Sequence, residues 1–172
     1  MGRNRTGKIA AKFAREWVRD VKKVKRRRRG DPTARPSRNA SPPRQASHRA
    51  REEADRQQRN GRTNGTAEAV TTADGRHTAV SVSDHPNNIY PPHREVARVL
   101  DGVPQNLRAP WHGNCALPQS LSRLLDQGID PRGGAVGAAR IRAPGNPGHG
   151  AHNPCCNSCV SLRNDFNLRE AL

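Results

Sequence analysis

Apolar positions near the start of the chain recur with a helical period. From residue 8 to about residue 29 they are spaced by four and three, which places them on one face of a helix. Most of the other positions in this stretch are Lys or Arg. The pattern predicts a basic amphipathic helix over residues 1–30. Its apolar face consists of Ile9, Phe13, Trp17, Val21 and Val24.

The next segment, residues 31–65, has no apolar period. Four prolines interrupt its first half, and the stretch around residues 47–58 is polar on every side. A polar segment buries too little apolar surface to offset the entropy that is lost on ordering. We therefore expect residues 31–65 to be a disordered linker rich in Pro and Arg, and order to begin near residue 66.

Residues 66–172 contain patterns of both strands and helices. Two β-branched segments, residues 67–72 and 77–82, flank the turn dipeptide Asp74-Gly75, which predicts a hairpin. Three later segments have apolar residues at helical spacing, and one segment between them is typical of a strand. The expected order is strand, strand, helix, helix, strand, helix, which makes an α/β domain. The later elements are expected at residues 93–100, 118–127, 135–142 (the strand) and 156–166.

The 172-residue chain has a net charge of +16, and most of this charge lies near its start. Residues 1–62 carry 21 Lys and Arg against 6 Asp and Glu, while the remaining residues carry 10 against 9. Clustered cations bind nucleic acid phosphates by releasing counterions, and they also bind anionic membranes. Residues 1–30 are therefore expected to contact nucleic acid non-specifically, to contact an anionic membrane, or to remain a solvated arm.

Hydrophobic stretches in the chain are short. None approaches the roughly 18–20 apolar residues of a membrane span, and the first residues lack the apolar centre of a secretory signal. We expect neither a transmembrane segment nor a signal peptide.

Three of the four cysteines have the spacing of a metal site. Cys115 stands in HGNCA, and about forty residues later Cys156 and Cys159 stand in PCCNSC. A C-x-x-C at a helix start lets both sulfurs reach one ion, and a third thiolate at a second helix start favours a shared zinc site. Cys155 is the alternative to Cys156 as a ligand, although the C-x-x-C spacing favours Cys156. The predicted cofactor is Zn²⁺.

These motifs and their flanks resemble a known family. The stretches WHGNCALPQSLSRLLDQGIDPRGG and RIRAPGNPGHGAHNPCCNSCVSLRNDF are similar to the YwqJ-related deaminases, a bacterial branch of the cytidine-deaminase-like superfamily. The family pattern is H-G-x-C-A-E-P, a leucine-rich helix and P-C-x-x-C. The resemblance covers roughly residues 66–168. It implies an α/β/α sandwich built on a mixed sheet, with Zn²⁺ held by Cys115, Cys156, Cys159 and a water.

The same resemblance implies a function. An active chain would be a hydrolase that deaminates a nucleobase, a nucleotide, nucleic acid or a related amine, and His112 would contact the substrate or orient the loop. Members of the family are often toxin domains, so a companion immunity protein is an expected partner. The expected location is the bacterial cytoplasm, or a target cell reached by a route other than Sec.

Two departures from the family pattern bear on activity. The superfamily has a proton-transferring glutamate two residues after the first ligand, and Leu117 stands there. Because a general acid–base group contributes about 10²–10⁴-fold to the rate, this difference predicts an inactive copy unless another carboxylate reaches the metal. Glu95 and Asp130 are the candidates. In addition, 13 residues follow Cys159, which predicts a sheet truncated at the C-terminus.

A non-catalytic interpretation uses the same residues. His112-x-x-Cys115 and Cys156-x-x-Cys159 form a Cys₃His set with two-residue spacers, which is typical of a structural zinc site with closed coordination. Such a site needs no glutamate. On this interpretation residues 66–172 are a zinc-stabilised module, and the basic arm binds nucleic acid through phosphates.

Overall fold

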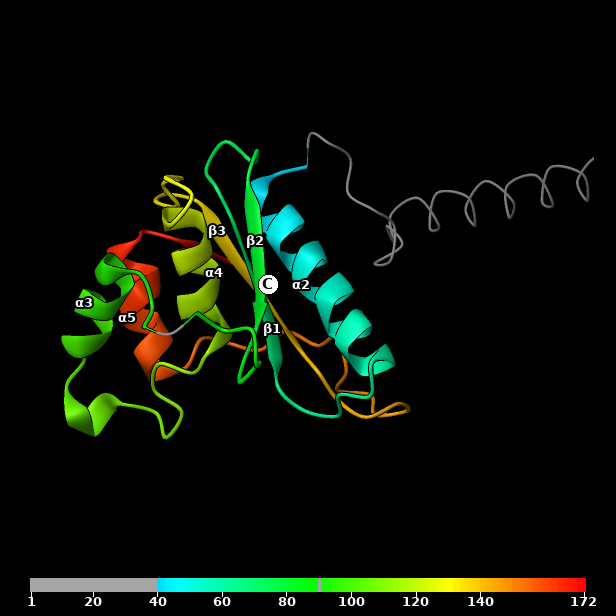
Figure 1. Cartoon of the computed structure of the whole chain (residues 1–172). Coiled ribbons are helices and arrows are strands. Elements are labelled where there is room, and N and C mark those ends of the chain that lie inside the picture. The colour runs from blue at the N-terminus through cyan, green and yellow to red at the C-terminus, as the bar shows by residue number, and fades with distance from the viewer. Residues whose placement is uncertain (1–39, 90) are drawn as a thin grey trace, which may run out of the picture. The chain divides into compact units, whose positions relative to one another are not determined.

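The computed structural model describes residues 40–89 and 91–172. The predicted basic helix over residues 1–30 lies outside them, as does the first part of the predicted linker. The described helices are α2 (Pro42–Arg59), α3 (Arg94–Asp101), α4 (Ala116–Leu125) and α5 (Asn157–Asp165), and the strands are β1 (Thr66–Thr71), β2 (Thr78–Val82), β3 (Ala135–Arg140) and β4 (Arg169–Ala171). They form an α/β domain with α2 on one face of a mixed sheet and α3, α4 and α5 on the other (Figure 1).

The strands lie in the order β2-β1-β3-β4. β1 is antiparallel to both of its neighbours, while β3 and β4 are parallel. Successive side chains of a strand point to opposite faces of the sheet. Ala67 and Ala69 of β1 therefore pack on the side of α2, and Glu68 and Val70 face α4. The central strand of the domain thus carries a carboxyl group into the layer that holds the cysteine-bearing helices.

Most elements expected from residue 66 onward are confirmed. β1 and β2 form the predicted hairpin, and Gly75 in its turn has a φ of 72°, a conformation that glycine adopts without strain. α3, α4, β3 and α5 lie within about two residues of their predicted positions. β4 is an addition. It has three residues and lies at the edge of the sheet.

The prediction of a disordered linker over residues 31–65 is wrong for residues 42–59, which form α2. Pro42 and Pro43 stand in its first turn, where no backbone N–H is needed. Ala46, Ala50 and Ala54 are spaced by four and fully buried against the sheet. Alanine has the highest helix propensity but contributes little to an apolar pattern, so the buried face of this helix resembles a polar linker in sequence.

α2 contacts the sheet most closely at Gly137 of β3. A Cβ at this position would lie 2.4 Å from the backbone nitrogen of Ser47 and 2.5 Å from the carbonyl carbon of Ala46. Only glycine permits this approach, because both atoms belong to the helix backbone. The interface is otherwise built from small side chains and two larger ones: Ala50, Ala54, Ala67, Ala69, Ala139, Val82 and Ile141.

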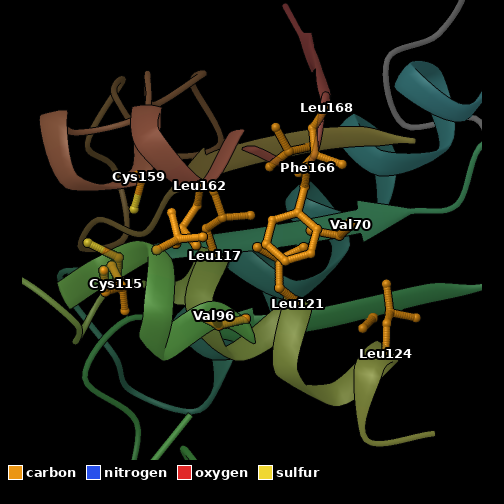
Figure 2. Packing of buried hydrophobic residues seen from close by; sticks show 14 residues of the cluster. Val70, Val96, Cys115, Leu117, Leu121, Leu124, Cys159, Leu162, Phe166 and Leu168 are labelled. Carbon is orange, nitrogen blue, oxygen red and sulfur yellow. The ribbon is translucent and has the colours of Figure 1, made fainter. Parts of the chain in front are cut away.

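The main hydrophobic core lies on the opposite face of the sheet (Figure 2). It is built from α4, α5, α3 and the loop after α5, and it packs against Val70 of β1. Leu117, whose position prompted the expectation of inactivity, is a fully buried member of this core. Cys115 and Cys159 lie together at one end of it (Figure 2). The core's largest side chains are Phe166, Leu117, Leu121, Leu124 and Leu162.

A membrane crossing would need a long, strongly apolar helix, and none of the helices in residues 40–89 and 91–172 meets that requirement.

The close contact at Gly137 leads to a stability prediction. Gly137→Ala should lower the free energy of unfolding by about 1–3 kcal/mol, because the new methyl group overlaps the α2 backbone. Gly102→Ala is the control, since residue 102 has a helical φ of −73° and its Cβ would meet its nearest atoms at 3.5 Å. Urea unfolding of both variants measures the difference. Equal stabilities would show that α2 does not dock on β3 in this way.

Candidate metal centre

Two cysteines begin the two helices that meet at the centre. Cys115 is the N-cap of α4 and Cys156 is the N-cap of α5, and their backbone angles are nearly the same: φ and ψ are −67° and 161° at Cys115, and −69° and 164° at Cys156. Cys159 lies one turn into α5. The free N–H groups at a helix start favour negative charge. Because the sulfur atoms lie at the starts of α4 and α5, both helices favour the thiolate form of these cysteines.

The three sulfur atoms are close enough to share one ion. All lie within 4.8 Å of one another, and the Sγ atoms of Cys115 and Cys156 are 3.4 Å apart. In a tetrahedral site with Zn–S bonds of about 2.3 Å, neighbouring sulfurs are about 3.8 Å apart. All four cysteines of the chain fall within the described residues, and all are free thiols. The sulfur triangle therefore fits a zinc ion after small adjustments.

The proton affinities within the triangle are unequal. Hydrogen bonds from the thiols of Cys115 and Cys159, together with the amide groups of Ser158 and Cys159, lower the pKa of Cys156 far below its usual value. The hydrogen bond that Cys115 makes to Cys156 raises the pKa of Cys115. Hydrogen bonds to Cys115 and Cys156 raise the pKa of Cys159, whose side chain is buried. Cys156 is therefore the thiol of the three that ionises most readily, and a metal ion would displace protons from the cysteines on binding.

Cys155 lies outside the sulfur triangle. Its backbone N–H donates to Oε1 of Glu170, its side chain packs against the main core, and burial raises its pKa to about 12. The structure therefore brings Cys156, and not Cys155, together with Cys115 and Cys159.

His112 binds a serine beside the triangle. Its Nδ1 lies 2.9 Å from Oγ of Ser158, and the same oxygen accepts the backbone N–H of Ala109 at 3.2 Å. Ser158 is fully buried between the two cysteines of α5. It fastens the loop before α4 to the first turn of α5. Among the described residues, the group of ligating atoms close enough for one ion consists of the three cysteines and does not include His112.

The triangle opens onto a cleft of about 580 Å³. The cleft lies where the first turns of α4 and α5 meet the ends of β1 and β2. Its walls are mixed: Trp111 is 56% exposed, Arg142 supplies a cation, and Asn114 and Asn153 supply amides. A cleft of this size is large enough for a small molecule next to the sulfurs.

A buried carboxyl group that sequence reasoning missed also lines this cleft. Glu68 is 4% exposed, and within the described part of the chain its Oε2 has no hydrogen-bond partner. Burial and the negative charge of Cys156 raise the pKa of Glu68 from 4.5 to about 8, and a hydrogen bond from the backbone N–H of Leu117 opposes this effect. The sequence held one signal: a glutamate among the small and β-branched residues of a central strand.

Both carboxylates suggested by the sequence are engaged elsewhere. Oε2 of Glu95 lies 2.6 Å from Arg132, and Oδ1 of Asp130 lies 3.1 Å from the same side chain. Neither residue lines the cleft. The expectation that one of them reaches the metal is therefore not supported, because their partner Arg132 holds both away from the sulfurs.

Comparisons with family models, with curated proteins and with solved structures gave no match for this chain.

The raised pKa of Glu68 predicts that this residue's own contribution to stability depends on pH in the metal-free, reduced protein. Between pH 4.5 and about 8 the unfolded chain ionises Glu68 while the folded chain keeps the proton, so the contribution of Glu68 to stability falls as the pH rises and levels off above pH 8. The lowered pKa of Cys156 acts in the opposite direction in both the parent chain and a Glu68 variant. A tenfold difference in proton affinity corresponds to about 1.4 kcal/mol. Glu68→Gln should lack this contribution, so its stability should rise relative to that of the parent chain between pH 5 and pH 8.5 and exceed it by a few kcal/mol at pH 8.5.

Urea unfolding of the parent chain and Glu68→Gln at pH 5 and pH 8.5, with a chelator and a thiol reductant, gives the four stabilities. Parallel pH dependence in the two proteins would contradict the raised pKa.

The position of Ser158 predicts a second effect. Ser158→Ala should weaken zinc binding by about 10- to 100-fold, because the loop that carries Cys115 loses its attachment to α5. Competition with a zinc chelator measures the change, and Ser161→Ala, one turn along the same helix, is the matched control. Equal zinc affinity in the two variants would rule out this role of Ser158.

Proposed function

We propose that this domain is a zinc-dependent, deaminase-like hydrolase acting on a nucleobase or a related heterocyclic amine. The observation that carries the proposal is the meeting of three sulfur atoms, from the starts of two helices, at the wall of an open cleft. Three protein ligands and an accessible fourth position are typical of catalytic zinc sites, while structural sites are closed. The YwqJ-like motifs around the same cysteines support the reaction class.

The domain's own residues would divide the work. Cys115, Cys156 and Cys159 would hold the ion, which supplies Lewis acidity and lowers the pKa of a water to near 7. Trp111 offers an exposed ring for stacking on a planar base, and bases stack favourably on aromatic side chains. Arg142 and the amides of Asn114 and Asn153 offer polar contacts on the cleft walls. These features support a nucleobase, nucleotide or nucleic acid substrate.

The closed Cys₃His module remains the competing interpretation, and the contacts of His112 weigh against it. Its Nδ1 is engaged with Ser158, and it does not belong to the close group of ligating atoms described above. A bacterial toxin role, an immunity-protein partner and contact of the basic arm with nucleic acid or membranes are further parts of the family-based proposal.

Metal analysis tests the centre directly. Freshly purified, reduced protein should contain about one zinc per chain, and Ser replacement of Cys115, Cys156 or Cys159 should remove most of it, because two thiolates bind zinc far more weakly than three. Cys155→Ser is the matched control and should keep the metal. Zinc loss in Cys155→Ser, or its retention in Cys156→Ser, would contradict the assignment.

Two further measurements separate the competing interpretations. Cobalt(II) substitution should show thiolate charge-transfer bands that stay unchanged in His112→Ala, whereas a closed Cys₃His site would change its visible spectrum. Release of ammonia from free nucleosides, nucleotides and single-stranded nucleic acid should require zinc and be lost in Cys156→Ser. Loss of the cobalt signature in His112→Ala, without activity in the parent chain, would favour the structural module.

A further inference from the structure

The position of Glu68 gives the proposed centre a proton carrier in an unexpected place. Its side chain comes from β1, in the middle of the sheet, and not from α4. It shares the cleft with Cys115, Cys156 and Cys159. The two carboxylates that the sequence suggested, Glu95 and Asp130, both pair with Arg132. Oε2 of Glu68, in contrast, has no hydrogen-bond partner among the described residues.

A second contact places this carboxyl group at the start of α4. The backbone N–H of Leu117 donates to it, and Leu117 is the residue two positions after Cys115. The side chain of Leu117 itself is committed to the hydrophobic core. The head group of Glu68 therefore lies next to the backbone position from which the family's glutamate extends. β1, through Glu68, and the start of α4 thus line the same part of the cleft.

The cost of this arrangement argues for a role in chemistry. Burying a carboxyl group with an unpartnered oxygen is unfavourable, and buried polar atoms in folded proteins nearly always have partners. The described neighbours of Oε2 do not supply one. The residue lines the cleft together with the three sulfur atoms. A rotation of its side chain would bring the unpartnered oxygen to a molecule bound there.

We propose that Glu68 is the catalytic acid–base residue of this centre and replaces the glutamate missing at position 117. This inference rests on the proposed function. Glu68 accepts a proton from the attacking water and gives it to the ring nitrogen of the amine-bearing heterocycle, while the water oxygen bonds to the adjacent ring carbon. It then takes the hydroxyl proton of this adduct and delivers it to the amino group. The C–N bond breaks, ammonia leaves, the ring keeps a carbonyl oxygen, and Glu68 returns to its starting state with no oxidant or reductant consumed.

An anion-binding experiment tests this placement without relying on activity. The zinc is replaced by cobalt(II), and azide binding to the open coordination position is titrated at pH 9, well above the usual pKa of a carboxyl group. Glu68→Gln should bind azide about tenfold more tightly than the parent chain, because a negative charge beside the anion has been removed. Glu95→Gln is the matched control, an exposed carboxylate paired with Arg132, and should bind azide as the parent chain does.

Activity gives the second arm. With ammonia release as the readout, zinc-loaded Glu68→Gln should lose about 10²–10⁴-fold in rate while retaining one zinc per chain, and Glu95→Gln should keep the rate. Unchanged azide affinity in Glu68→Gln overturns the proposal whether or not a substrate has been found, and so does an unchanged rate. A parent chain that binds no cobalt overturns the metal centre itself, and the role of Glu68 falls with it.

Discussion

The meeting of two helix N-termini on one point is the constraint on which the rest of this domain depends. α4 and α5 both begin at a cysteine with an extended backbone. Ser158 ties the loop before α4 to the first turn of α5, and both helices pack on the same core. Thiol and amide donors lower the pKa of Cys156 and so favour its thiolate form. A metal would therefore meet sulfurs that are already gathered, and little chain entropy would be lost on binding.

The buried carboxyl group of Glu68 lowers the stability of the fold and makes the wall of the cleft polar. An apolar residue in place of Glu68 would extend the packing that Val70 provides two residues later on the same face of β1. A carboxyl group there must instead hold its proton to pH values at which exposed carboxyl groups are fully ionised. Stability and the proposed chemistry thus make opposite demands at a single position of the central strand, as is common where binding or catalysis is built into a core.

The elements that the sequence predicted well carry a local signal. The leucines of α4 mark its buried face, and the turn dipeptide Asp74-Gly75 between two β-branched segments marks the hairpin of β1 and β2. The cysteine spacing indicated which thiols would meet. α2 was missed because its buried face consists of alanines, and what buries them is Gly137, more than seventy residues away in the sequence. β4 was missed because three residues are too few to give a period. Glu68 was missed because a charged residue in a strand is normally a solvent-exposed one.

In the proposed centre, the positions of the metal ligands are more tightly constrained than the position of the proton carrier. Three sulfurs must meet within a few ångströms at tetrahedral angles, and helix starts provide this geometry together with favourable amide groups, so the ligands are tied to α4 and α5. A proton carrier needs only a carboxyl oxygen within hydrogen-bond reach of the reacting atoms. A residue on α4 or a residue on β1 can both provide it, since the N–H of Leu117 already contacts the head group of Glu68. In the proposed function, Leu117 therefore leaves β1 to supply the carboxyl group, and Glu68 keeps such a group at the wall of the cleft.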